Sequence, residues 1–245
     1  MTQVELIAVE GLPEVRPGDD LAQLISQRAK FQPGDLLVVA QKVVSKSEGR
    51  IVDLKTVTAG DRAKQIAPAL VARPDPRVVQ VVLDESVRVL RSERALITET
   101  KHGFVAANSG VDHSNIPGGD NVALLPADPD ASARALRSRL RELIGIDVGI
   151  VISDTFGRPW RLGIVNVALG LAGLPAVVDL RGQDDDVGKR LQATVLAVAD
   201  EVAAAAGLVM GKTRRTPAVI VRGLNLEGDG RGRDLIRPAD EDLFR

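Results

Sequence analysis

The residues best suited to chemistry follow an apolar run, Val148–Ser153, which is typical of a buried strand. We expect this strand to end at Asp154, so that Asp154 and Thr155 lie at its carboxyl end, ahead of a glycine-containing loop. A carboxylate beside a hydroxyl suits Mg²⁺, which prefers oxygen ligands and keeps waters that a phosphate can replace. In the loop, Arg158 and Arg161 could bind phosphate or carboxylate oxygens through forked hydrogen bonds. The alternative is structural: the carboxylate caps a turn and the arginines lie in solvent.

A second group of oxygen-bearing side chains lies in the segment Asn108–Asn115. Asp112 could share a metal ion with Asp154, and Asn115 could hydrogen-bond a base or a ribose. The same composition is typical of an ordinary turn, because Asn, Asp, Ser and Gly are the usual turn residues. Residue types alone leave both interpretations open, and His113 stands alone and is not expected to be a ligand.

A basic group follows the predicted strand Leu36–Val39, within the segment Gln41–Arg50. Lys42, Lys46 and Arg50 recur there beside serine hydroxyls, so the segment could contact phosphate. The alternative is a solvated face, which is the more common role of such a charge pattern.

One phosphate-binding motif is excluded by its context. Gly207–Thr213 is one residue short of a P-loop between its glycines. A P-loop also needs a strand before it and a helix after it, whereas here a predicted helix precedes and a predicted strand follows. We therefore reject a P-loop, although Lys212 could still contact a nucleotide.

The elements that must position these residues alternate between strand-like and helix-like periods, which predicts an α+β or mixed α/β protein. No clean domain boundary is visible. Asp130 and Ser132 are expected to cap a helix, Gly103 lies near the tip of a predicted hairpin, and the Gly-rich tail after Gly223 is expected to be mobile. The predicted strands and helices are Val4–Val9, a helix beginning near Asp20, Leu36–Val39, a helix over 61–71, a mixed stretch over 78–90, the hairpin 95–107, Asn121–Leu125, a helix over 132–144, Val148–Ser153, a helix over 195–209 and Ala218–Val221.

Composition excludes several function classes. The 245 residues fit one large domain or two small lobes, and Lys+Arg 32 against Asp+Glu 33 gives a net charge of −1, which favours neither nucleic acid nor an anionic membrane. With Cys 0 there is no disulfide, thiolate nucleophile or zinc–thiolate site. Motifs of dinucleotide redox enzymes, serine hydrolases and zinc proteases are missing. No run resembles a signal peptide or a membrane span, so we expect a soluble, cytoplasmic protein.

Several of these segments, in this order, resemble the coenzyme F420-0:L-glutamate ligase family. The similarity extends from about residue 4 to about residue 224, and separated, rare motifs in register are a specific signal. The sequence departs from the family pattern in three places: at Gly207, over Leu162–Val165, and over Asp184–Lys189. The matching segments are Val9–Val15 with Pro17–Asp20, Gln41–Arg50, Ala95–Thr100, Gly110–Asn115, Ser153–Arg161 and 199–212.

The resemblance implies a ligase that uses GTP and a divalent ion, Mg²⁺ or Mn²⁺, with K⁺ as a further ion. Its substrates would be F420-0, L-glutamate and GTP, joined by an amide bond, with later additions through the γ-carboxylate. The family fold is a mixed α/β arrangement that forms an intertwined homodimer. Residues 1–245 would then be a single ligase unit, in one piece or as two interleaved lobes, with a polar tail over 224–245.

Site roles follow by motif from the same resemblance. Lys46, Asp154 and Arg158 are the expected catalytic residues. The expected GTP contacts are Leu12, Pro13, Glu14, Val15, Gln41, Lys46 and Asn115. The expected metal ligands are Asp112, Asp154 and Thr155.

Two other classes of function use the same residue types. A metal-dependent nucleotide phosphohydrolase would turn over GTP without an acyl acceptor, and a non-catalytic nucleotide-binding module would have no turnover at all. Residue types alone do not separate the three, and the resemblance favours the ligase.

Overall fold

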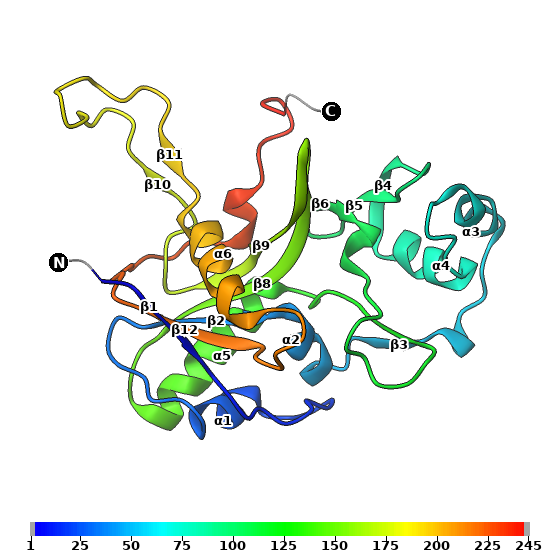
Figure 1. Cartoon of the computed structure of the whole chain (residues 1–245), viewed down its shortest axis with the longest axis horizontal. Helices are drawn as coiled ribbons and strands as arrows, with labels where there is room; N and C mark the ends of the chain where they lie inside the picture. Colours follow the sequence, from blue (N-terminus) through cyan, green and yellow to red (C-terminus); the bar gives the residue numbers. More distant parts are fainter. Residues whose placement is uncertain (1–2, 243–245) are drawn as a thin grey trace.

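The computed structural model describes residues 3–242, which form a mixed five-stranded sheet with helices on both faces and a smaller group of elements beside it (Figure 1). The strand order in the large sheet is β1-β12-β2-β8-β9, with β2 and β8 parallel and the other neighbours antiparallel. Its strands are β1 (Glu5–Ala8), β2 (Leu36–Ala40), β8 (Gly149–Arg158), β9 (Arg161–Ala172) and β12 (Ala218–Arg222). The mixed α/β class predicted from the sequence is confirmed.

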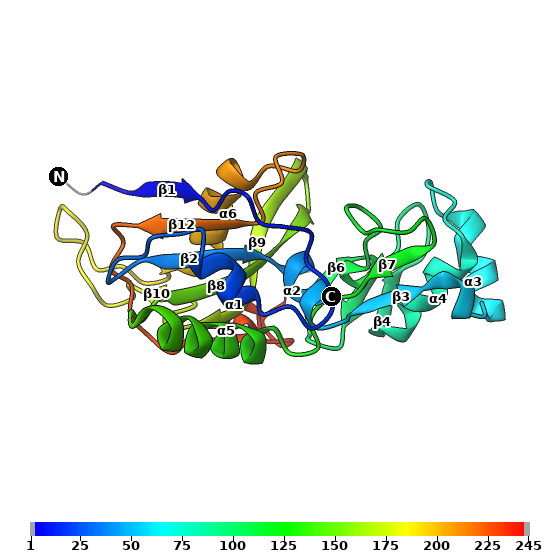
Figure 2. The ribbon, with the colours of Figure 1, turned by 90° about the horizontal axis from the view of Figure 1, so that it is seen from below.

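Alternating side chains of the central strands fill two separate cores. Leu37 and Val39 of β2 pack toward α1 (Leu21–Ser26) and α5 (Pro129–Ile144), whereas Leu36 and Val38 pack toward α6 (Val198–Met210). Figure 2 shows the sheet from below, between α5 on one side and α6 on the other. Because both faces are covered, β2 is apolar at every position and buried at every position except its last, as expected for a strand buried on both sides.

A further core lies in the chain between β2 and α5 and has its own short strands and helices. Val79, Val82 and Leu96 are among its buried residues. Its elements project to the right of the large sheet in Figure 1. They are β3 (Ile51–Asp53), α3 (Asp61–Ile66), α4 (Pro76–Asp84), β4 (Ser86–Arg91), β5 (Ile97–Thr100), β6 (Val105–Ala107) and β7 (Asn121–Ala123).

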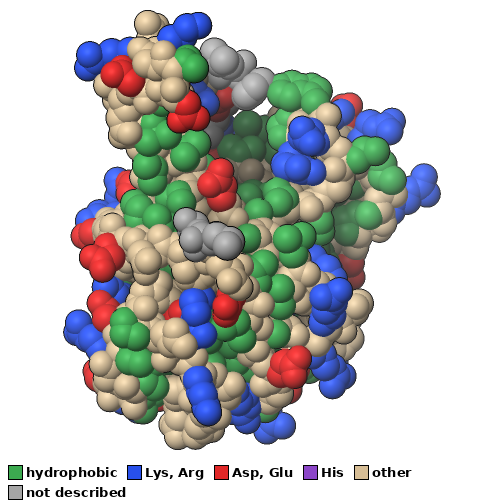
Figure 3. Space-filling model, turned by 60° about the vertical axis from the view of Figure 1, so that its left-hand side comes forward, with side chains coloured by type: hydrophobic (Ala, Val, Ile, Leu, Met, Phe, Trp, Pro, Cys, Tyr) green, Lys and Arg blue, Asp and Glu red, His purple; other side chains and the backbone are tan. Residues whose placement is uncertain are grey.

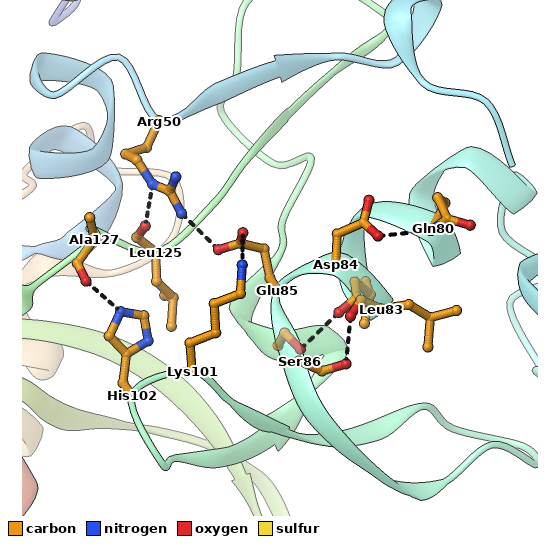
Figure 4. Close-up of polar contacts among 12 residues, drawn as sticks. Arg50, Gln80, Leu83, Asp84, Glu85, Ser86, Lys101, His102, Leu125 and Ala127 are labelled. Carbon is orange, nitrogen blue, oxygen red and sulfur yellow. Dashed lines mark hydrogen bonds and ion pairs between the residues drawn. The ribbon is translucent and has the colours of Figure 1, made fainter. Parts of the chain in front are cut away.

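Charged and polar contacts hold this part against the segments that follow α2 and precede α5 (Figure 4). Arg50, just after α2 (Gln41–Ser47), donates to the Leu125 carbonyl at 3.0 Å and pairs with Glu85 at 2.7 Å. Lys101 pairs with the same Glu85 carboxylate at 3.1 Å. Arg50, one of the three basic residues with a predicted phosphate contact, therefore has a structural role at this junction.

An arm that carries β10 (Val178–Asp179) and β11 (Val195–Leu196) projects from the body. Charged side chains of both signs cover its outer end (Figure 3). Val195 and Leu196 belong to this arm and not to α6, so the predicted helix begins later than expected.

Three other expectations from the sequence are wrong. The strand β8 does not end at Asp154 but continues through Arg158, so the predicted loop is the end of a β8–β9 hairpin. The cap of α5 is Asp128, which accepts from the Ala131 amide at 2.9 Å. Asp130 instead accepts from the amides of Leu171 and Gly232, both at 2.9 Å.

The Gly-rich tail is the third correction, because its described part packs along β9. The Gly230 amide donates to the Leu174 carbonyl at 2.9 Å. A Cβ at Gly232 would lie 1.9 Å from the Leu169 carbonyl oxygen, so only glycine permits this approach. Residues 243–245 of the predicted tail lie outside the described residues.

The remaining predicted elements are confirmed in type and approximate position, including the β5–β6 hairpin with Gly103 in its turn. Within residues 3–242, none of the helices combines the length and the apolar composition that crossing a lipid bilayer requires.

Candidate active site

A large cavity lies where the parallel strand β2 reaches its carboxyl end beside β8. Ala40, the last residue of β2, pairs with Ser153 of β8. Beyond Ser153, β8 continues with β9 as its partner, so one edge of β8 faces open space. Ligand sites in α/β sheets commonly occupy such a carboxyl-end crevice.

This cavity has a volume of about 930 Å³ and is lined by six separate segments of the chain. It brings together nine of the predicted site residues: Leu12, Pro13, Glu14, Val15, Gln41, Lys46, Asn115, Asp154 and Thr155. Two predicted residues, Asp112 and Arg158, do not line it. The other contributors include Lys42, Ser153, Asn166, Gly207 and the turn from Met210 to Thr213.

Lys46 is the most deeply placed cation of the cavity. It lies on α2, its side chain is 7% exposed, and it pairs with Glu14 of the segment that precedes α1. Gln41, at the start of α2, is also buried and accepts from the Ser45 hydroxyl at 2.9 Å. The sharp change from β2 to α2 therefore aims both polar side chains at the space beyond the sheet.

Asp112 stands behind the cavity wall and is joined to it by Lys42. The Lys42 ammonium lies 2.6 Å from Asp112 Oδ2, and the Ser114 amide donates to Oδ1 at 2.7 Å. Burial alone would raise the pKa of Asp112, but hydrogen bonds from Lys42 and Ser114 outweigh it and hold the pKa below its usual range. Asp112 is thus a carboxylate that stays ionised.

Asp154 has the opposite environment. Burial raises its pKa, and the charge of Asp112 adds to the increase, while the Thr155 amide, Lys212 and Lys42 oppose it. A cation bound beside Asp154 would therefore remove an electrostatic penalty that the protein alone leaves in place.

Thr155 lies on the side of the cavity that α6 closes. The Lys212 ammonium, in the turn after α6, donates to Thr155 Oγ1 at 2.6 Å. Lys212 therefore reaches the cavity, although its segment is not a P-loop: α6 precedes it and β12 follows, as the sequence predicts.

Arg158 lies away from the cavity, near the end of the β8–β9 hairpin. Its guanidinium donates to the Leu162 carbonyl at 2.9 Å, and its buried Nε has no hydrogen-bond partner among residues 3–242. Within one chain the structure does not bring Arg158 together with the other predicted catalytic residues.

Sequence reasoning missed Asn166, which lines the cavity from β9 opposite Thr155. A polar residue inside an otherwise apolar strand was the available signal. Gly207, which lies against Asn166, was noted as part of the rejected P-loop and as a departure from the family pattern, but not as a neighbour of Asn166.

The oxygen atoms of these side chains suit a hard divalent ion that is also coordinated by a bound substrate. No three His, Cys, Asp or Glu side chains within residues 3–242 cluster so that they could hold a metal by themselves. Asp112 and Asp154 interact electrostatically, and Thr155 adds a hydroxyl oxygen. Mg²⁺ commonly binds through one or two carboxylates and completes its shell with water and substrate phosphates, so the residues present fit such an ion.

Comparisons with known proteins agree with one another. The family model described as F420-0:Gamma-glutamyl ligase matches residues 11–223. A curated relative from Methanopyrus kandleri, named coenzyme F420:L-glutamate ligase, is 47% identical, with 98% of each chain covered. Relatives of the same name from Archaeoglobus fulgidus and Methanocaldococcus jannaschii are 46% and 44% identical, with 99% of this chain and 97% of theirs covered. With a match of this extent and identity, this chain belongs to the F420-0:gamma-glutamyl ligase family.

Proposed function

We propose that this protein is a GTP-dependent ligase that joins L-glutamate to F420-0 through an amide bond and releases GDP and phosphate. The observation that carries the proposal is the cavity of about 930 Å³, which collects carboxylate, hydroxyl and lysine groups from separate segments. The relatives' name supplies the substrates, and their full-length similarity supports carrying them to this chain.

The proposed roles follow the walls of the cavity. Leu12 to Val15, Gln41 and Asn115 would contact GTP, with Lys46 beside its phosphates. Phosphate would displace Glu14 from Lys46, because a multiply charged anion is the stronger partner for an ammonium. Asp112, Asp154 and Thr155 would hold Mg²⁺ or Mn²⁺, which neutralises the phosphates; K⁺ is a further predicted ion.

The chemistry requires activation of a carboxylate. A carboxylate oxygen of F420-0 would attack the γ-phosphorus of GTP, forming an acyl phosphate while GDP leaves. The glutamate amine, after losing a proton, would attack the acyl carbon and expel phosphate. No protein nucleophile is needed, so the task of the residues is to position groups and neutralise charge. Further γ-linked additions would repeat the same steps.

A homodimer is part of the proposal, and the β8–β9 hairpin supports it. Leu162 is 98% exposed and Trp160 is 83% exposed, both at the hairpin end. Exposed large apolar side chains gathered on one element mark an association surface. Packing of this surface on a second copy would place Arg158 near the junction between chains, where it could hold an acidic substrate.

Phosphoryl transfer to F420-0 can be tested with GTP that carries an isotope label at the β,γ-bridging oxygen. The proposal expects positional exchange of the label when F420-0 and a divalent ion are present and glutamate is absent. Failure of exchange in every combination of substrates would contradict the acyl phosphate.

The dependence of GTP consumption on the other substrates distinguishes a ligase from the competing phosphohydrolase. The ligase should consume GTP only when both F420-0 and glutamate are supplied. Full-rate phosphate release from GTP and a metal ion alone would identify a phosphohydrolase instead.

A further inference from the structure

The side-chain carboxamide of Asn166 lies very close to the neighbouring helix α6. Asn166 on β9 lies directly opposite Thr155 on β8, so the two side chains share the face that α6 covers. Its Nδ2 points toward the Ser153 hydroxyl at 3.4 Å and the Met210 sulfur at 3.7 Å. Since a thioether only accepts hydrogen bonds, these contacts assign the nitrogen to that side and leave Oδ1 on the other.

The room for this carboxamide is provided by Gly207. A Cβ built at Gly207 would lie 2.9 Å from both Oδ1 and Cγ of Asn166, closer than real Cβ contacts allow without a shift. Gly207 lies in the interior of α6, and its φ is not in the left-handed region. Glycine is the weakest helix former after proline, so its backbone freedom does not explain its presence here. The close approach of Asn166 does.

The carboxamide oxygen is the polar group left without a protein donor. No hydrogen bond from residues 3–242 reaches Asn166 Oδ1, and both Asn166 and Gly207 line the large cavity. The nearby groups are the Thr155 hydroxyl with the Lys212 ammonium upon it, and the buried Ser153. An open acceptor at this point suits a ligand that brings positive charge or N–H groups.

We infer that Asn166 is a further binding residue of this site, whose Oδ1 contacts a cationic group beside Thr155 in space that Gly207 keeps free. Two groups share this chemistry: the divalent ion, and the ammonium of the amine substrate. The second source rests on the proposed function, and the first can be measured without it.

The test uses the full chain and compares Asn166→Leu with Asn166→Asp. Leucine keeps the approximate size and removes the acceptor, whereas aspartate keeps an oxygen and adds charge. Gly207→Ala should act in the same direction as Asn166→Leu, because the new methyl group displaces the carboxamide. Leu208→Ala is the matched control, since Leu208 is on the same helix and 76% exposed.

Mn²⁺ binding is measured with the metal alone by electron paramagnetic resonance, and L-glutamate and GTP are measured through their KM values. We expect Asn166→Leu and Gly207→Ala to weaken Mn²⁺ affinity or raise the glutamate KM by about tenfold or more. The KM for GTP should stay within about twofold, and Asn166→Asp should retain or strengthen the affected ligand. A change in Mn²⁺ affinity identifies the metal as the ligand, and a change in the glutamate KM alone identifies the ammonium.

Unchanged Mn²⁺ affinity and unchanged glutamate KM in folded Asn166→Leu would overturn the inference. Equal weakening of all three ligands, with a lower unfolding temperature, would overturn it as well, because it indicates a structural role. If Asn166→Leu does not fold, Gly207→Ala decides by the same readouts. A wild-type protein that makes no glutamyl product would refute the proposed function, while glutamate and Mn²⁺ binding, measured directly by calorimetry, would still decide the role of Asn166.

Discussion

Lys42 Nζ lies 2.6 Å from Asp112 Oδ2, and this ion pair joins α2 beside the large sheet to the chain segment that carries the smaller core. The Lys42 side chain is 15% exposed and the Asp112 side chain is 40% exposed, so water screens the pair only in part. Through Lys42 the ionised state of Asp112 is coupled to the wall of the cavity, which gives a first prediction.

Lys42→Met should raise the pKa of Asp112, because the variant loses a hydrogen bond and a charge that lower it. The measurement is an NMR titration of the carboxyl carbons. Lys64→Met is the control, since Lys64 is 61% exposed and only 3.8 Å from Asp61 in a weak pair. An Asp112 pKa that stays the same would show that Lys42 does not set it.

Asp154→Asn should separate activity from stability. Burial raises the pKa of Asp154, which means that the ionised carboxylate is disfavoured in the folded protein, so a neutral amide should not lower the free energy of unfolding. Turnover should fall by about 100-fold or more, equivalent to about 2.7 kcal/mol in the barrier, because a metal ligand is lost. Urea unfolding and steady-state rates on the same samples test both parts. A large loss of stability with intact turnover would contradict the assignment.

Asp200→Asn tests a half-buried acid outside the cavity. Asp200 on α6 accepts from the Ala168 amide at 2.8 Å, next to the β8–β9 bulge, and burial raises its pKa. The unfolded chain therefore releases this proton at a lower pH than the folded chain does. As pH rises from the unfolded pKa through the raised folded pKa, the wild type loses stability, and the loss is complete above the folded pKa.

The asparagine variant keeps an acceptor oxygen and cannot ionise. Its free energy of unfolding should therefore increase relative to that of the wild type across this pH interval. Urea unfolding at pH 4 and pH 8 measures the difference. Asp61→Asn provides the control, because Asp61 is 95% exposed. If the unfolding free energy of the variant instead falls relative to that of the wild type between pH 4 and pH 8, the predicted sign is refuted.

Leu162→Asp should prevent self-association through the hairpin. Leu162 is 98% exposed, and a charge at the centre of an apolar contact costs more than it gains from the partner. Light scattering after size exclusion should give a dimer mass for the wild type and a monomer mass for the variant. Val71→Asp should remain dimeric, because Val71 is 74% exposed and lies away from the hairpin, in the chain segment that carries the smaller core. A monomeric wild type would contradict the proposed homodimer.

Local patterns predicted those parts of the site that depend on neighbours along the chain. An apolar run ends just before Asp154 and Thr155, and another precedes the segment that carries Lys46, so periodicity alone singled these residues out. In the structure Asp154 and Thr155 lie within β8, and Lys46 lies on α2. The segment from Leu12 to Val15 came from the family resemblance, because its residue types carry no chemical signal of their own.

The rest depends on relationships between distant segments. Asp130 was predicted to cap α5, but its carboxylate accepts hydrogen bonds from one amide of β9 and one of the tail. Asp128 is the cap residue instead. β8 extends past Asp154 because β9 pairs with it up to Arg158, which no local signal indicates. The fit of Gly207 to Asn166 requires the strand register and the placement of α6 together.

The most direct test of the central claim is to incubate the protein with GTP, Mg²⁺ or Mn²⁺, L-glutamate and F420-0, and to follow the coenzyme by mass spectrometry. The account predicts a gain of one or more glutamyl units that requires GTP and is lost in Asp154→Asn. An unchanged coenzyme mass, with GTP consumed whether or not F420-0 is present, would contradict it.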